Sequence, residues 1–201
     1  MKKSDEKIFY IKDYKYADNG EIDISFIPMM QRRKLSKVDR FAIYTLSHFK
    51  DFEIEEIVYS SQYGEFERLA KLIGQYSADN EVSPILFSGS VHNYLVGLYS
   101  QMNKFTSSYT SISAGEKSLS MGLLKSILTE NKNTLFCYAD NCDGVVKSVS
   151  CLVSGDDGKI KCRFKKVNSG AKADEFDEFV KFLNGDTKKA VFSGFEVERV
   201  D

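Results

Sequence analysis

Long apolar runs are missing from this sequence. No segment approaches the ~20 consecutive apolar residues of a membrane-spanning helix, and residues 1–20 include lysines but no apolar run of signal-peptide length. An excess of one charge is missing too, because 28 Lys and Arg residues face 29 Asp and Glu residues, which leaves a formal net charge of -1. Without a global positive field, nucleic acid is not an expected partner. We expect a cytoplasmic protein with no membrane span.

Patterns typical of metal sites and disulfide frameworks are also missing. The four cysteines are separated by four, eight and ten residues, which matches neither a Cys-x-x-Cys knuckle nor the dense scaffold of a secreted protein. Three of them, Cys137, Cys151 and Cys162, fall in predicted strands, where a free cysteine packs as a small buried hydrophobe. We therefore favour reduced core cysteines over a metal site, and we expect no metal or tightly bound cofactor.

Hydrophobic periodicity predicts strands that alternate with helices. Ser36 and Asp39 have the spacing of a helix capping box, and apolar residues then recur at helical intervals to form one core-directed face: Leu35, Val38, Ala42, Leu46 and Phe49. A second helical pattern over residues 66–76 places Leu69, Leu72 and Ile73 on one side. Further helices are predicted at 90–102 and after Gly115, and strands at 8–11, 53–61, 107–114 and 133–140.

The chain after about residue 145 predicts two antiparallel strands, an amphipathic helix and one last strand. This exposed-looking strand and helix could cover a partner. Together the elements predict an α/β protein, with a mixed sheet and helices on both faces. The length of 201 residues suits one domain, residues 1–201.

The segment from Ser111 to Glu116 is a small, tight strand-to-helix turn, where function often gathers in such sheets. One interpretation is a capping box in which Ser113 and Glu116 satisfy each other's backbone N–H groups. Another is a loose nucleophile elbow with Ser113 exposed for acyl transfer. The chain order opposes the elbow, because an α/β-hydrolase histidine follows its serine, whereas His48 and His92 both precede Ser113.

Four blocks of the sequence resemble one protein family. They are FIPMMQRRKLSKVDRFAIYTL, IVYSSQYGE, SPILFSGSVHNYLVGLYSQM and SISAGEKSLSMGLL, and together they span most of residues 26–140. Their order is similar to that of the β-ketoacyl synthase-like amino-terminal domains, thiolase-like proteins found beside condensing enzymes of fatty-acid, polyketide and aryl-polyene synthesis. The resemblance implies a thiolase-like half with a mixed, mostly five-stranded sheet.

The resemblance also implies that the catalytic cysteine is missing. Laying the ketosynthase motif on this sequence puts Ala114 at the nucleophile position and Gly122 on the helix glycine, and Asn93 and Gly97 support the same register. A slip of one residue would put Ser113 there, still without a thiol. Ketosynthases also use two histidines, or a histidine and an asparagine, from a second half that this chain lacks. A thiolate at a helix amino terminus is what attacks the acyl thioester, and alanine cannot supply it.

The implied function is that of a non-catalytic, chain-length-factor-like partner of a full-length ketosynthase, acting in a homo- or hetero-oligomer. A carrier protein could dock on the basic run Arg32-Arg33-Lys34, with its acyl-phosphopantetheine as the possible ligand; a solvated helix start explains the same run.

The alternative function is an acyl-thioesterase or acyltransferase that uses Ser113 with His92, and with Glu116 as a further candidate. His92 and Asn93 could bind a thioester carbonyl, although a structural histidine at a helix end explains the pair equally simply. His48 is expected to contact the carbonyl groups at a helix end.

Overall fold

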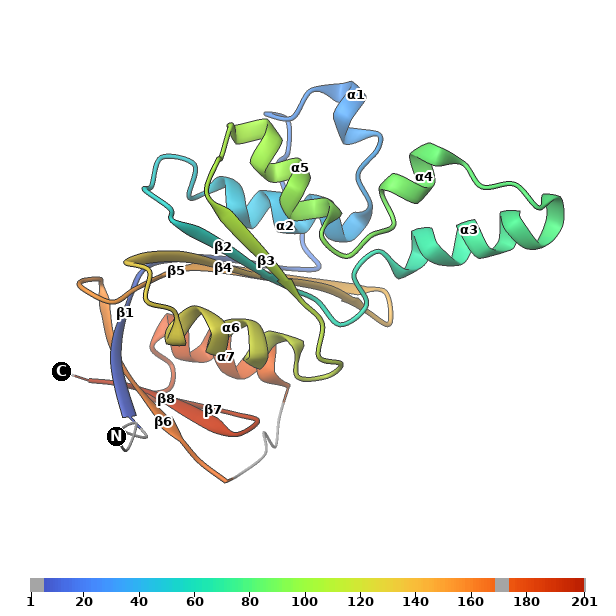
Figure 1. Cartoon of the computed structure of the whole chain (residues 1–201). Helices are drawn as coiled ribbons and strands as arrows, with labels where there is room; N and C mark the ends of the chain where they lie inside the picture. The colour runs from blue at the N-terminus through green and yellow to red at the C-terminus, as the bar shows by residue number, and fades with distance from the viewer. Residues whose placement is uncertain (1–5, 169–173, 201) are drawn as a thin grey trace.

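The computed structural model describes residues 6–168 and 174–200, which form one eight-stranded sheet with helices on both faces (Figure 1). The strands are β1 (Glu6–Asp18), β2 (Glu56–Ser60), β3 (Ser108–Ile112), β4 (Asn133–Cys142), β5 (Val145–Ser154), β6 (Ile160–Lys166), β7 (Lys189–Phe192) and β8 (Phe195–Arg199). The helices are α1 (Met29–Arg32), α2 (Lys37–Ser47), α3 (Phe66–Asp79), α4 (Pro84–Ser88), α5 (Tyr94–Asn103), α6 (Ser118–Leu128) and α7 (Glu175–Asn184).

The sheet is mixed, with strand order β3-β2-β4-β5-β1-β6-β8-β7. β2 pairs in parallel with β3 and β4, and the other neighbours pair antiparallel. The predicted α/β class is therefore confirmed, but the expected five strands become eight. One reason is the last predicted strand, which is a hairpin of β7 and β8 that turns at Gly194 with φ +91. The order of the strands also differs from expectation, because β1 continues to Asp18 and lies between β5 and β6, which sequence order alone had left side by side.

Each face of the sheet carries its own apolar core. α2 and α5 cover one face, and α6 and α7 cover the other (Figure 1). The predicted face of α2 is confirmed, because all five of its apolar residues are buried: Leu35, Val38, Ala42, Leu46 and Phe49. Its predicted start is confirmed as well, since the Ser36 and Asp39 side chains each accept a hydrogen bond from the other residue's backbone N–H.

The chain after residue 145 belongs to the core. β5 is buried along most of its length, and α7 buries Phe176, Phe179, Phe182 and Leu183 against the sheet. The prediction that this strand and helix are exposed was therefore wrong. Alternating apolar residues there serve intramolecular packing, because β5 runs through the middle of the sheet.

The cysteines predicted to lie in strands are buried core residues. Cys137, Cys151 and Cys162 are free thiols with essentially no exposed surface, and burial raises the pKa of the Cys137 thiol to about 12. Among the described residues, no three His, Cys, Asp or Glu side chains are grouped to hold a metal ion. Within residues 6–168 and 174–200, no helix is both long and apolar enough to cross a membrane.

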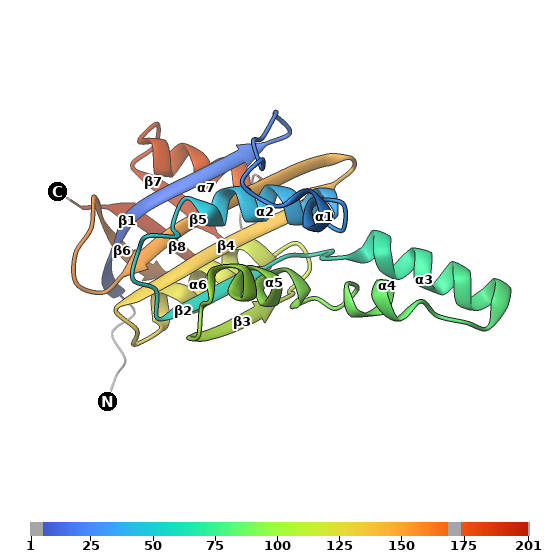
Figure 2. The ribbon, with the colours of Figure 1, turned by 90° about the horizontal axis from the view of Figure 1, so that it is seen from above.

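α3 and α4 project away from the rest of the molecule (Figure 2). We call residues 66–91, which contain both helices, the α3–α4 arm. The predicted apolar side of α3 is present, but only Leu72 is buried, whereas Leu69 and Ile73 are 43% and 58% exposed. Periodicity thus predicted the apolar face of α3 correctly, but it did not predict that most of this face is exposed.

Candidate functional site

The turn between β3 and α6 lies where the parallel strands end, as predicted. Ser113, Ala114, Gly115 and Glu116 are all exposed there. The expected capping box of Ser113 and Glu116 does not form. Gly115 adopts a left-handed conformation with φ +60, so the chain makes an extra turn and the helix begins only at Ser118.

Ser118 takes over the capping role in this turn. Its hydroxyl accepts a hydrogen bond from the Ala114 backbone N–H at 3.0 Å and donates to the Gly115 carbonyl at 2.7 Å. The Ser113 hydroxyl instead donates to the Gln62 carbonyl at 3.3 Å. Ala114 is therefore held four positions before the first helical residue.

The amino-terminal end of α6 is occupied by a carboxylate from α7. Glu175 accepts a hydrogen bond from the Ser120 backbone N–H at 3.1 Å, and its second oxygen accepts from the Ser193 N–H at 3.3 Å. The helix dipole and its unpaired N–H groups attract an anion, and here an internal side chain supplies it. No sequence signal pointed to Glu175, because its partner is 55 residues away in the chain.

His92 holds the turn that follows β2. Its Nε2 lies 3.1 Å from the Ser61 carbonyl oxygen, and because a carbonyl only accepts, this nitrogen carries the proton. The ring also packs beside Tyr59, with 5.6 Å between centroids, and against Gly64, where an added Cβ would lie 3.1 Å from it. In the described part of the chain, no hydrogen bond joins His92 to Ser113, although both bond to adjacent carbonyls of one turn.

A buried aspartate that sequence reasoning missed organises the same turn. Asp140, at the end of β4, has no exposed surface and accepts hydrogen bonds from the Ser61 hydroxyl at 2.8 Å, the Gln62 N–H at 2.5 Å and the Tyr63 N–H at 3.0 Å. Hydrogen bonds from backbone amides stabilise such a buried carboxylate. A single acidic residue closing an otherwise apolar strand was the signal that could have identified it.

The remaining predicted residues lie apart from this turn. Asn93 is exposed at the start of α5, without a side-chain cap. Arg33 and Lys34 are exposed at the junction of α1 and α2, and Arg32 is half-buried beside them. The His48 side chain contacts a carboxylate, since its Nε2 lies 3.2 Å from Asp13 Oδ2, and the His48 backbone N–H donates to the Leu46 carbonyl at the end of α2.

Arg68 forms the charged centre at the base of the arm. Its guanidinium lies 2.7 Å from Asp39 Oδ2 and 2.9 Å from Glu65 Oε2, so both buried carboxyl groups lie beside the same cation. Burial, and then the nearby Asp39 charge, raise the pKa of Glu65 to about 8. A proton on Glu65 thus allows two buried carboxyl groups to share one guanidinium.

A hollow of about 310 Å3 lies beside the α6 terminus. Gln62, Glu116, Lys117 and Glu175 line its polar side, and Leu119 and Tyr138 its apolar side. A second hollow, of about 350 Å3, lies between the α2 start and the base of the arm. Both hollows are open and have partly apolar linings.

Comparison with known proteins identifies the relatives of this fold. The family model described as "Beta-ketoacyl synthase, N-terminal domain" matches residues 11–142. The chain is also similar to a chain in the solved structure described as "Ketosynthase (ApeO) in Complex with its Chain Length Factor (ApeC) from Xenorhabdus doucetiae", with a TM-score of 0.76 and 21% sequence identity. That similarity covers 96% of this chain and 99% of the other. No curated protein matches the sequence.

Proposed function

The chain belongs to the β-ketoacyl synthase N-terminal domain family, and from this premise we propose that it is a non-catalytic, chain-length-factor-like partner of a complete ketosynthase. In this role it binds the condensing enzyme and helps to shape the space that the growing acyl chain occupies. It supplies no nucleophile of its own. The pathway would be one of fatty-acid, polyketide or aryl-polyene synthesis.

The observation that carries the proposal is the turn at Ala114. Condensation in this family starts with a thiolate that attacks an acyl thioester, and the residue at that position has only a methyl group. The end of the helix that would lower a thiol pKa already donates a hydrogen bond to the carboxylate of Glu175. The two histidines have other partners, since His48 bonds Asp13 and His92 bonds the Ser61 carbonyl.

The size of the structural relative supports a partner role. The matched chain is covered over 99% of its length, so a protein of nearly the same extent occurs in a solved complex of a ketosynthase with its chain length factor. Exposed Arg33 and Lys34 are suited to contact an acidic carrier protein that delivers an acyl-phosphopantetheine to such a complex.

Acyl transfer to this chain is the direct test. The purified protein and its Ser113→Ala variant are incubated with acyl-loaded and malonyl-loaded carrier protein, and intact mass reports any covalent adduct. We expect no adduct on either protein. An adduct on the unmodified chain that disappears in Ser113→Ala would establish the acyltransferase alternative and overturn the non-catalytic proposal.

Co-expression tests the partner role. The complete ketosynthases encoded in the source genome are produced one at a time with and without this chain. We expect one of them to co-purify with it and to change the length or yield of its acyl products when the chain is present. A chain that binds none of them would contradict the proposal.

A further inference from the structure

The loop around α1 exposes three large apolar side chains. We call residues 24–35 the α1 loop, and within it Phe26, Met29 and Met30 are 54, 60 and 71% exposed. α1 itself buries no residue. It lies at the top of Figure 1, farther from the sheet than α2. Apolar side chains that are exposed together in this way are typical of an interaction site.

The α1 loop is fixed to the body of the protein. Ile27 and Leu35 are buried core residues, with 0% and 5% of their surface exposed. Arg68 also donates a hydrogen bond to the Lys34 carbonyl oxygen at 2.6 Å, which ties the end of the loop to α3. Because the loop is already held in place, the chain loses less conformational entropy when the loop is bound.

Basic residues follow the apolar side chains in the sequence. Between residues 24 and 38 every charged residue is basic: Arg32, Arg33, Lys34 and Lys37. Arg33, Lys34 and Lys37 are exposed, and Arg32 is half-buried. Arg40 of α2 lies beside them, because its guanidinium donates to the Arg32 carbonyl oxygen at 3.3 Å. The α1 loop thus combines an apolar tip with a basic rim.

Acidic residues near the loop offset only part of this charge. Asp23 precedes the loop, and the hydrogen bond from Ser25 and then the charge of Arg32 lower the pKa of its carboxyl group. Asp39 follows the loop, but it is buried against Arg68. The exposed charges of Arg33 and Lys34 therefore remain for a ligand.

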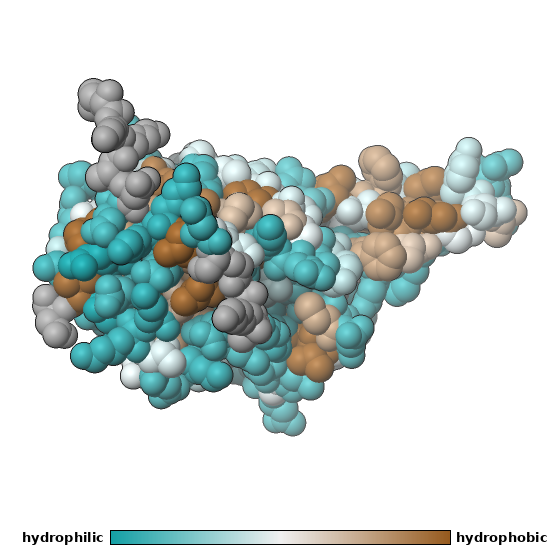
Figure 3. All heavy atoms as spheres, turned by 90° about the horizontal axis from the view of Figure 1, so that it is seen from below, coloured by the Kyte–Doolittle hydropathy of each residue, from teal (hydrophilic) through white to brown (hydrophobic). Residues whose placement is uncertain are grey.

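The α3–α4 arm is a second exposed apolar surface, but its charges have the opposite sign. Figure 3 shows apolar side chains gathered along the arm. Its exposed charged residues are Glu67, Asp79 and Glu81 against Lys71 alone. Anionic lipid head groups attract a basic rim and repel an acidic one. An anionic bilayer therefore distinguishes the α1 loop from the arm.

The apolar tip of the α1 loop favours a bilayer over a carrier protein as its ligand. Ion pairing with an acidic carrier protein uses the charges of Arg33 and Lys34 but gives the three apolar side chains no partner. Three side chains are also a small surface beside the ~800 Å2 per partner that a stable protein–protein interface buries. At a bilayer surface, by contrast, basic side chains meet the head groups while apolar side chains enter the acyl boundary.

We propose that the α1 loop docks this protein on an anionic lipid bilayer. Phe26, Met29 and Met30 insert at the interface, and Arg33 and Lys34 lie beside the head groups. The contact is peripheral and reversible, because a small inserted apolar area gives only weak binding and the basic residues add to it. This inference goes beyond the proposed partner role and does not depend on it.

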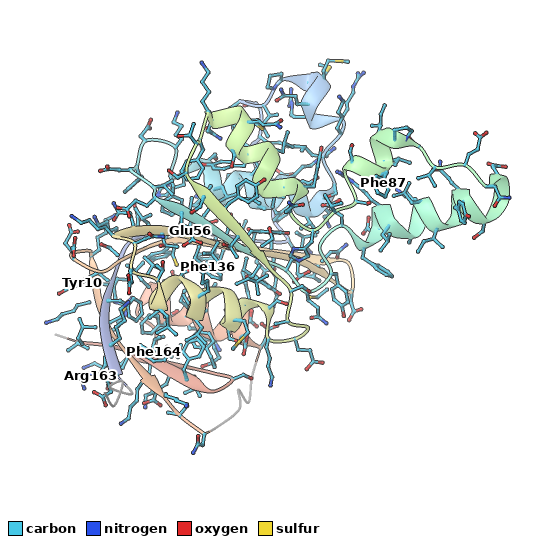
Figure 4. All side chains as sticks on the ribbon, in the orientation of Figure 1. Tyr10, Glu56, Phe87, Phe136, Arg163 and Phe164 are labelled. Atoms are coloured by element: carbon cyan, nitrogen blue, oxygen red, sulfur yellow. The ribbon has the colours of Figure 1, made fainter. Side chains whose placement is uncertain are left out.

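The first test uses the absence of tryptophan from the sequence. Phe26→Trp places a single indole in the α1 loop, and Phe87→Trp is the matched control on α4, where Phe87 is 61% exposed (Figure 4). Each protein is mixed with vesicles of phosphatidylcholine alone or with an equal part of phosphatidylglycerol. We expect a blue shift of the emission, and quenching by brominated lipid, only for Phe26→Trp with the vesicles that contain phosphatidylglycerol.

Vesicle co-sedimentation measures the affinities of further variants. We expect Met30→Asp, and separately the double variant Arg33→Gln with Lys34→Gln, to bind the phosphatidylglycerol vesicles at least about tenfold more weakly than the unmodified chain. Ile73→Asp, at a side chain 58% exposed on the arm, should bind within about twofold. Added salt should weaken binding of the unmodified chain, because it screens the attraction of the basic rim to the head groups.

Several results would overturn the inference. An unmodified chain that does not bind the phosphatidylglycerol vesicles does so, and so does binding that Met30→Asp and the double variant leave unchanged. Quenching of Phe87→Trp in place of Phe26→Trp would make the arm the inserted surface. If the chain ignores vesicles but binds acyl carrier protein, and Met30→Asp weakens that binding, the ligand of the loop is the carrier. Co-purification with a ketosynthase tests the partner role separately, so none of these results contradicts it.

Discussion

The carboxylate of Glu175 accepts a hydrogen bond from the backbone N–H of Ser120, with 3.1 Å between Oε2 and N. This contact brings a negative charge from α7 to the amino-terminal end of α6, the helix that follows Ala114. A helix end lowers the pKa of a nearby thiol because its positive dipole stabilises the thiolate. The Glu175 charge opposes this stabilisation at the end of α6.

A thiol introduced by Ala114→Cys should therefore react more slowly than the catalytic cysteine of a ketosynthase. We expect its alkylation rate by iodoacetamide to rise with pH around the ordinary value of a free thiol, about 8.5. Adding Glu175→Gln should move the midpoint down by about half a unit to one unit, because the neutral amide no longer opposes the thiolate. A midpoint below about 7 in the single variant would show that the helix end activates the position despite Glu175.

Glu65 should make stability depend on pH. Its pKa is raised from the ordinary 4.5 to about 8, so as pH rises through this interval the unfolded chain ionises Glu65 while the folded chain retains the proton. The contribution of the protonated Glu65 side chain to stability is complete below pH 4.5 and is lost as pH passes 8. The free energy of unfolding of the unmodified chain should therefore fall as pH rises from 4.5 to 8. We expect Glu65→Gln to make this fall smaller by on the order of 2 kcal/mol.

Urea denaturation across the same interval measures this effect. Glu116→Gln is the matched control, because the Glu116 side chain is exposed. Parallel stability curves for Glu65→Gln and the unmodified chain would contradict the raised pKa of Glu65.

Two helical glycines should respond oppositely to the same substitution. An alanine Cβ at Gly122 of α6 would lie 2.5 Å from Ser60 Oγ and 2.7 Å from Phe136, whose ring lies between the sheet and α6 in Figure 4. We expect Gly122→Ala to lower the free energy of unfolding by about 1 to 3 kcal/mol through overpacking. Gly74 of α3 has nothing within 4 Å, so Gly74→Ala should raise it by about 0.5 to 1 kcal/mol. Chemical denaturation checks both, and equal effects would mean that α6 does not pack this closely on β2.

His92 and Ser113 should contribute separately to stability. We expect His92→Ala to cost about 1 to 2 kcal/mol, because it loses the 3.1 Å hydrogen bond to Ser61 and the contact with Tyr59. Ser113→Ala should cost less than about 0.5 kcal/mol, since the hydroxyl is exposed. In the double variant the two costs should add to within about 0.5 kcal/mol. A coupling energy above about 1 kcal/mol in denaturation experiments would indicate a direct Ser113–His92 interaction.

Two identical sequence spacings show what a local sequence pattern can and cannot predict. Ser36 with Asp39 and Ser113 with Glu116 both have the capping-box interval, but only the first pair forms the box. At the second, the left-handed conformation of Gly115 delays the helix to Ser118. The strand-to-helix turn was thus located correctly from sequence, but its hydrogen bonds were not, because a glycine permits a backbone path that spacing cannot select.

The sequence alone shows that residue 114 is an alanine and not a cysteine. The alanine, the amphipathic face of α2, the buried strand cysteines and the alternation of strands with helices all follow from residue identity and short-range periodicity, which act over a few neighbouring residues. The insertion of β1 between β5 and β6, the carboxylate of Glu175 at α6 and the uncovered face of α3 were decided by the tertiary structure alone. Each depends on segments that are distant in the chain, and periodicity shows which face is apolar without showing what packs against it.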